Sequence, residues 1–111
     1  MYARPSKILI IDDDVELVTL LVDYFTLEGF EATPAHSGTE GLQALESKEF
    51  DLIILDVMMP GIDGLSFAQK IKQHKLWSHI PLILLSALHH EDDQVKGIES
   101  GAEAYVTKPF N

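Results

Sequence analysis

The residues of this sequence with the clearest chemical potential each come at the end of a short apolar stretch. Three of them carry a carboxylate, one a hydroxyl and one an ammonium group. In chain order they are Asp12, Asp13, Asp56, Ser86 and Lys108. Parallel strands of an open sheet end along a common edge, and ligands bind at the carboxyl ends of such strands. If the apolar stretches are parallel strands, we expect the five side chains to meet in one site.

Carboxylates gathered in one site require a cation. Two carboxylates about 4 Å apart repel each other by roughly 4 kcal/mol at an effective dielectric constant of about 20. Mg²⁺ is a hard ion that binds one or two carboxylates and keeps several of its waters. Such a site leaves one carboxylate free to attack a phosphoryl group. Mg²⁺ and Lys108 would neutralise the phosphoryl oxygens, and Ser86 would donate a hydrogen bond to one of them.

Each of these residues also has an ordinary structural explanation. Aspartates between a strand and a helix commonly cap the helix, which would explain the acidic run 12–14. A serine at a strand end usually bonds to nearby backbone, and a lysine usually lies in solvent. The functional interpretation therefore depends on whether the fold brings the residues to one edge of a sheet.

The elements that must position these residues form an alternation of apolar strands with amphipathic helices. The expected strands cover 7–11, 31–35, 52–55, 82–86 and 104–107, and the expected helices cover 15–28, 39–47, 65–74 and 91–100. Several strands are apolar on both faces, which is typical of a parallel sheet between two layers of helices. We therefore expect an α/β domain with a doubly wound, five-stranded parallel sheet. No helix follows the last strand, so either the domain is cut short there or a partner covers that face.

Local signals predict the limits of individual elements. Asp14 is placed to cap the first helix, and Gly29 to end it. Pro34 cannot donate a backbone hydrogen bond, so its strand should lie at the edge of the sheet. The last helix is mostly polar, and we expect Val95 and Ile98 to form its thin buried face. A helix with so little apolar anchoring suits an element that moves when the protein switches.

Composition narrows the class of protein. The chain has 111 residues, no cysteine, five scattered histidines and a formal net charge of −10. A negative surface repels phosphate backbones, which disfavours direct nucleic-acid binding by this domain. The absence of cysteine excludes disulfides, and the scattered histidines argue against a histidine metal site. Without a signal peptide or an apolar stretch of membrane-spanning length, we expect a cytoplasmic domain that does not enter a membrane.

Four motifs, taken in order, resemble the receiver domain of response regulators in two-component signalling. They are IIDDD at 10–14, LDVMMPGIDG at 55–64, ILLSA at 83–87 and YVTKPF at 105–110. Each motif alone is modest, but the ordered set covers nearly the whole chain. The resemblance, which extends to chemotaxis regulators, implies a single receiver domain over residues 1–111. It also implies a flavodoxin-like fold with strand order 2-1-3-4-5, here lacking its C-terminal fifth helix.

The resemblance assigns the acidic residues to two roles. Asp56 would accept a phosphoryl group from a phosphohistidine or from a small phosphodonor. Asp12, Asp13 and Asp56, together with the backbone carbonyl of Met58, would hold Mg²⁺ or Mn²⁺.

The remaining site residues would bind the phosphoryl group or respond to it. Ser86 would be the switch hydroxyl, Lys108 would contact the phosphoryl oxygens, and Tyr105 would change rotamer as Ser86 moves. The peptide bond before Pro109 would be cis, which an X–Pro bond permits at low cost.

The resemblance also implies the partners of the domain. A histidine kinase or a phosphotransfer domain would supply the phosphoryl group. The domain would promote only its own phosphorylation and dephosphorylation, so it would not be an enzyme in the usual sense. A fused kinase or output domain, and a homodimer, are left open by the sequence.

Three other functions fit part of the pattern. An FMN-binding flavodoxin shares the fold but needs a phosphate loop rich in hydroxyl groups and glycine, where this chain has the acidic run 12–14. An aspartate-nucleophile phosphohydrolase carries a second acid two residues after the nucleophile, where this chain has Met58. An interaction domain that is never phosphorylated would lack a site residue, and none is missing here.

Overall fold

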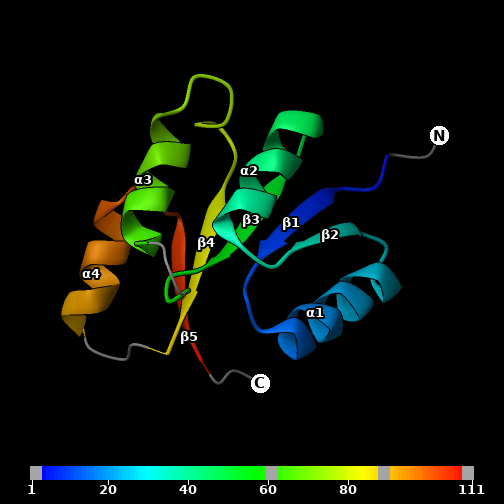
Figure 1. Ribbon diagram of the computed structural model, residues 1–111, viewed down its shortest axis with the longest axis horizontal. Coiled ribbons are helices and arrows are strands. Elements are labelled where there is room, and N and C mark those ends of the chain that lie inside the picture. Colours follow the sequence, from blue (N-terminus) through cyan, green and yellow to red (C-terminus); the bar gives the residue numbers. More distant parts are fainter. Residues whose placement is uncertain (1–3, 60–62, 88–90, 109–111) are drawn as a thin grey trace.

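The computed structural model describes residues 4–59, 63–87 and 91–108. Five parallel strands form one sheet in the order β2-β1-β3-β4-β5, with helices on both faces (Figure 1). The strands are β1 (Lys7–Ile11), β2 (Glu31–Ala35), β3 (Leu52–Asp56), β4 (Leu82–Ser86) and β5 (Ala104–Thr107). The helices are α1 (Val15–Leu27), α2 (Gly38–Ser47), α3 (Gly64–Gln73) and α4 (Glu91–Glu99). This confirms the predicted flavodoxin-like fold, and every predicted boundary agrees with the structure to within one residue.

Capping residues explain where the helices begin and end. The Asp14 side chain accepts a hydrogen bond from the Leu17 N–H at 3.1 Å, which confirms the predicted N-cap of α1. Past the end of the same helix, Gly29 has a φ of +94°, a conformation that side-chain-bearing residues rarely adopt. The predicted limits of α1 are therefore both confirmed.

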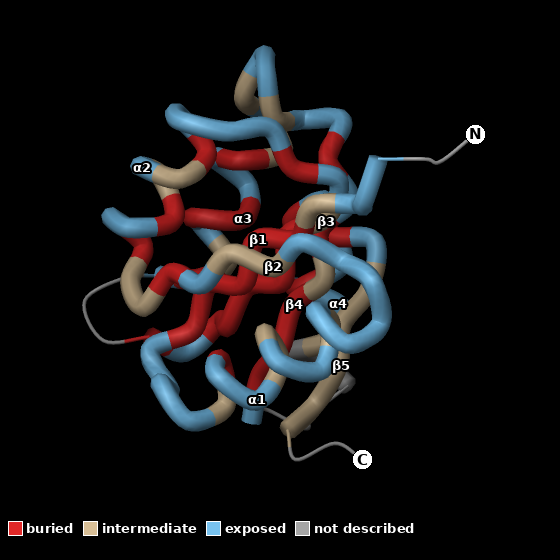
Figure 2. The backbone as a smooth tube through the Cα atoms, turned by 90° about the vertical axis from the view of Figure 1, so that its right-hand side faces the viewer, coloured by how far each residue is buried: buried red, intermediate tan, exposed pale blue. Residues whose placement is uncertain are grey.

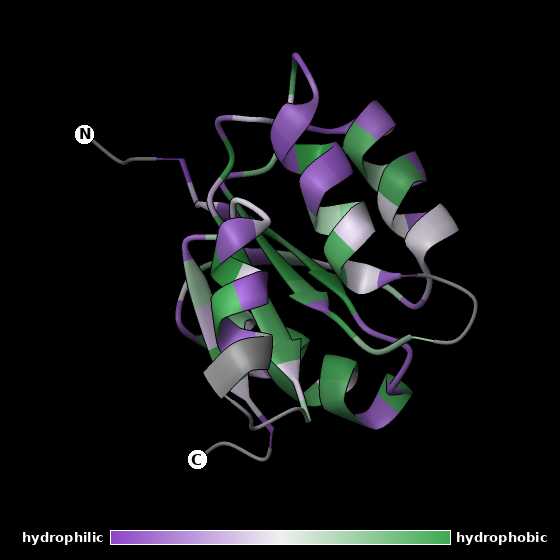
Figure 3. Ribbon diagram, turned by 90° about the vertical axis from the view of Figure 1, so that its left-hand side faces the viewer, coloured by the Kyte–Doolittle hydropathy of each residue, from purple (hydrophilic) through white to green (hydrophobic). Residues whose placement is uncertain are grey.

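The sheet separates two apolar layers, as strands buried on both faces require. In β1, Leu9 and Ile11 pack toward the layer that contains α2 and α3, whereas Ile8 and Ile10 pack toward α1. Figure 2 shows the buried backbone concentrated in the centre of the molecule, and Figure 3 shows that the central strands are largely hydrophobic while the helices carry both hydrophobic and hydrophilic residues. Alternate residues of one strand thus serve opposite layers.

The edge position predicted for the proline-containing strand is confirmed. Within the described part of the chain, strand β2 pairs only with β1, and Pro34 lies opposite Ile10 in the register. An edge strand needs hydrogen bonds on one side only, so the missing N–H of Pro34 is tolerated.

The predicted buried face of α4 is wrong. Val95 and Ile98 are 48% and 46% exposed, whereas Gly97 is buried. A Cβ atom built on Gly97 would lie 2.5 Å from Cδ2 of Tyr105 and 3.1 Å from a methyl group of Leu84. The helix therefore contacts β4 and β5 through its backbone at a glycine, which turns the neighbouring apolar side chains toward solvent.

A charged network joins α3 to the edge of the sheet where β4 and β5 begin. Lys72 Nζ lies 2.8 Å from Glu103 Oε1 and donates a second hydrogen bond, also 2.8 Å, to the carbonyl of Ile80. The other carboxylate oxygen of Glu103 accepts a hydrogen bond from the Leu82 N–H at 2.6 Å. Near this edge, the rings of His74 and Trp77 stack with centroids 3.7 Å apart.

Among the described residues there are four helices, and none of them follows β5. None of these helices is both long enough and apolar enough to span a membrane.

Candidate functional site

The predicted acidic residues meet where β1 and β3 end. The two strands pair in register up to Ile11 and Leu55, so Asp12 and Asp56 continue from neighbouring positions. Asp12, Asp13 and Asp56 each offer a carboxylate oxygen, and these oxygens lie within 4.8 Å of one another. Asp12 and Asp56 are buried, with 0% and 3% exposure, whereas Asp13 is exposed. The fold therefore creates the acidic cluster that the sequence predicts.

Lys108 brings a positive charge into this cluster from the end of β5. Its Nζ atom lies 2.9 Å from Asp12 Oδ2 and 3.5 Å from Asp56 Oδ2. The backbone N–H of Lys108 donates to the carbonyl of Ser86 at 2.7 Å, which fixes the start of the side chain. One ammonium group thus faces three carboxylates, and the cluster keeps an excess of negative charge.

Burial and the neighbouring charges together change the pKa of the central carboxylate. Burial, with a smaller contribution from the charge of Asp12, raises the pKa of Asp56 from 3.8 to about 6. The Met58 N–H and the Lys108 ammonium act in the opposite direction but do not outweigh burial. For Lys108, burial lowers the pKa, yet the hydrogen bond and charge of Asp12 prevail and hold it above its usual value.

Two backbone contacts orient the buried carboxylates. Asp12 Oδ1 accepts a hydrogen bond from the Asp14 N–H at 3.0 Å, and Asp56 Oδ1 accepts one from the Met58 N–H at 3.1 Å. In both cases the second oxygen, Oδ2, is the one close to Lys108. These two contacts were not predicted from the sequence, although an aspartate that accepts a hydrogen bond from the N–H two residues later is a familiar local pattern.

The two predicted switch residues lie on the neighbouring strands. Ser86 is fully buried at the end of β4, one position beyond Leu85, which pairs with Asp56. Tyr105 lies on β5 opposite Leu84, partly buried in the apolar layer beneath α4. Pro109 lies outside the described residues, so the cis peptide bond before it remains a prediction.

The donor set of the cluster suits a hard divalent cation. All three acidic side chains offer oxygen ligands from within a few ångströms of one another. At Asp56, the ammonium group of Lys108 does not offset burial and the charge of Asp12, so the pKa stays raised. Mg²⁺ and Mn²⁺ favour carboxylate oxygens, so these residues fit the predicted ion.

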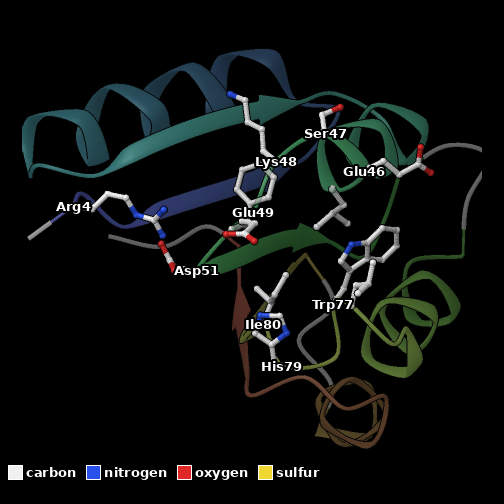
Figure 4. Close-up of a pocket in the computed structure, with 12 residues that line it drawn as sticks. Arg4, Glu46, Ser47, Lys48, Glu49, Asp51, Trp77, His79 and Ile80 are labelled. Atoms are coloured by element: carbon white, nitrogen blue, oxygen red, sulfur yellow. The ribbon is translucent and has the colours of Figure 1, made fainter.

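A surface pocket of about 520 Å³ lies away from the acidic cluster (Figure 4). Its lining includes Arg4, Phe50, Asp51, Trp77 and His79, which surround the ends of strands opposite to those that carry Asp12 and Asp56. None of the predicted site residues that the structure describes lines it. The acidic cluster and this pocket are therefore separate features of the surface.

The parallel sheet and its acidic edge are those of a flavodoxin-like α/β domain, and comparison with known proteins gives the family. The response regulator receiver domain family matches residues 8–111, and the chain belongs to this family. The chain is 47% identical over 105 residues to an uncharacterized transcriptional regulatory protein of Bacillus subtilis, YclJ. That alignment covers 95% of this chain but 45% of the relative, so the chain spans less than half the length of such regulators.

Solved structures of receiver domains share the same fold. Chemotaxis protein CheY4 of Vibrio cholerae has a TM-score of 0.90 at 27% identity, over 97% of this chain and 90% of that one. Response regulator TrrA of Thermotoga maritima, solved in complex with Mg²⁺-BeF, has a TM-score of 0.82 at 37% identity, over 96% and 89% of the two chains. The resemblance predicted from the motifs is confirmed.

Proposed function

We propose that Asp56 accepts a phosphoryl group in an Mg²⁺-dependent reaction and that the domain changes conformation in response. The observation that carries this proposal is the cluster of three carboxylates around a buried Asp56, with Lys108 3.5 Å from its side chain. The donor is the phosphohistidine of a histidine kinase or phosphotransfer domain, or a small phosphodonor.

In the transfer step, an oxygen of Asp56 attacks the phosphorus atom in line with the bond to the donor. A new P–O bond forms as the P–N bond of the phosphohistidine breaks, and its electron pair returns to the imidazole nitrogen. Lys108 already lies beside Asp56 and would neutralise charge on the transferred oxygens. The Ser86 hydroxyl would donate to one of these oxygens.

The acidic residues would hold the ion. Asp12, Asp13 and Asp56 supply carboxylate oxygens, and Met58 would supply its backbone carbonyl. When bound, Mg²⁺ or Mn²⁺ stabilises the negative charge that the phosphoryl oxygens carry in the transition state.

Phosphorylation would alter contacts that the structure already contains. Lys108 is bonded to Asp12, and a phosphoryl group on Asp56 would compete for that ammonium group. Ser86 would move toward the new oxygens, and Tyr105 would turn into the space that it leaves. Because the Tyr105 ring packs against Gly97, its rotation would shift α4.

The partners of the domain follow from this chemistry. We infer that it acts in the cytoplasm, where a histidine kinase phosphorylates it, and that its own reactions are limited to gaining and losing the phosphoryl group. Since the relative YclJ is a transcriptional regulatory protein of about twice the matched length, an attached output domain is the natural target of the switch. A phosphorylation-dependent homodimer is a second means of output.

Intact mass measurement after incubation with acetyl phosphate and Mg²⁺ tests the proposal. The wild-type protein should gain one phosphoryl group that hydroxylamine removes, because an acyl phosphate is labile to that nucleophile. Asp56→Asn should gain none. Equal labelling of the two proteins would move the acceptor to another residue.

A further inference from the structure

The first residue of α3 is pressed against the backbone of the acidic site. A Cβ atom built on Gly64 would lie 2.5 Å from Cα of Val57 and 2.7 Å from its carbonyl carbon, and closer still to its carbonyl oxygen. All three atoms belong to the backbone, which cannot move aside as the tip of a flexible side chain can. Only glycine allows α3 and this segment to approach so closely.

Val57 lies in the chain between Asp56 and the residue whose N–H orients the Asp56 side chain. Asp56 precedes it, and Met58 follows it, with its N–H bonded to Asp56 Oδ1 at 3.1 Å. The N–H of Val57 itself donates to the carbonyl of Leu85 at 2.9 Å, so the segment is still held in the sheet. The backbone at 57–58 therefore has little freedom to retreat from α3.

The helix has equally little freedom to retreat from the segment. Asp63 caps α3 by accepting hydrogen bonds from the Leu65 and Ser66 N–H groups at 3.1 Å and 3.3 Å. Phe67 and Ile71, further along the helix, are buried in the larger apolar layer. A side chain at position 64 would have to displace either a well-anchored helix or the backbone next to Asp56.

We propose that Gly64 is a positioning residue for the metal site. Gly64 lets α3 pack directly on Val57. This contact fixes the peptide bond between Val57 and Met58, whose N–H orients Asp56. It thereby also fixes the next carbonyl, that of Met58, which would face the ion. This inference rests on the proposed Mg²⁺ site. On this inference Gly64, which has no side chain, controls the geometry of the Mg²⁺ ligands.

Isothermal titration of the intact protein with Mg²⁺ tests the inference. Gly64→Ala should raise the dissociation constant for Mg²⁺ about tenfold or more, as changes in the groups that orient metal ligands commonly do. Gly29→Ala is the matched control, because Gly29 has a strained φ of +94° for alanine but nothing within 4 Å of its Cβ position. It should lower the melting temperature and leave the dissociation constant unchanged.

The outcomes separate the inference from the proposed function. Wild-type affinity in a folded Gly64→Ala protein would overturn the positioning role and leave the proposed function intact. If the wild-type protein bound no Mg²⁺, the proposed function would fail and the inference with it. Should Gly64→Ala not fold, Asp63→Ala loosens the same turn without adding an atom at position 64, and an unchanged dissociation constant in that variant would also overturn the inference.

Discussion

Two opposite edges of the same sheet each hold a lysine next to acidic side chains, but the charges are balanced differently. At the edge where β4 begins, Lys72 meets one carboxylate, that of Glu103, and the remaining contacts go to backbone groups. At the edge where β1 and β3 end, Lys108 meets the cluster of Asp12, Asp13 and Asp56. One network is neutral and the other carries surplus negative charge.

The pKa values of the carboxyl groups of Glu103 and Asp56, at the two edges, are shifted in opposite directions. Burial raises the pKa of Glu103, but the hydrogen bonds from Lys72 and from the Leu82 N–H outweigh it, so the net pKa is lowered. At Asp56, burial prevails and the pKa is raised to about 6. The negative charge of Glu103, whose contacts are structural, is thus stabilised by its neighbours. A carboxylate with a raised pKa indicates a place prepared for a further cation or for chemistry.

The largest expected difference between the edges concerns phosphorylation. Lys108→Ala should slow labelling by acetyl phosphate about 10²-fold, because one charged group that stabilises the transition state is lost. Lys72→Ala should leave the rate unchanged, since Lys72 lies at the other edge. Rates measured by intact mass in saturating Mg²⁺ test both, and an equal loss in the two variants would remove the functional distinction between the edges.

The next effect concerns stability and its pH dependence. Because folding raises the pKa of Asp56 from 3.8 to about 6, the native state favours the protonated form, and stability from this group is lost as pH rises across that range. Asp56→Asn has no charge to bury, so above pH 6 it should be more stable than wild type by about 1–3 kcal/mol. Urea unfolding in EDTA at pH 4 and pH 7.5 measures the change. A gain of the same size at both pH values would contradict this origin.

The smallest expected effect is purely structural. Lys72→Met keeps the apolar stem but removes both hydrogen bonds of the ammonium group, and we expect a loss of about 1–2 kcal/mol in the free energy of unfolding. Glu103 is half-exposed and can be hydrated again, which limits the loss. Urea unfolding of the variant checks the value, with Lys70→Met as a control on the same helix. A loss below about 0.5 kcal/mol would mean that the network contributes little.

The acidic edge could be predicted because the order of strands and helices along the sequence determines which residues lie at the ends of the strands. Short runs that are apolar on both faces identify parallel strands, and the residues after such runs must share an edge. No exact distance is needed to bring Asp12, Asp56 and Lys108 together. The family resemblance then assigned roles to residues that the fold had already gathered.

The Lys72–Glu103 network and the orientation of α4 depend on side-chain packing, which hydrophobic periodicity does not reveal. The network of Lys72 and Glu103 joins residues that are 31 positions apart, and its formation depends on how α3 lies against the turn before β5. The orientation of α4 was mispredicted because two apolar residues in a polar helix indicate a face only if side chains make the contact. At Gly97 the backbone makes the contact instead, and Val95 and Ile98 face solvent.

The stacked ring of Trp77 has a practical consequence for spectroscopy. It is the only tryptophan of the chain, and it lies beside His74 and lines the pocket shown in Figure 4, whose lining does not include Asp56. Its fluorescence should follow global unfolding as an optical reporter that ions at the acidic edge do not quench directly. A change in its emission on addition of Mg²⁺ would therefore indicate a conformational change transmitted from the acidic cluster to the surroundings of Trp77.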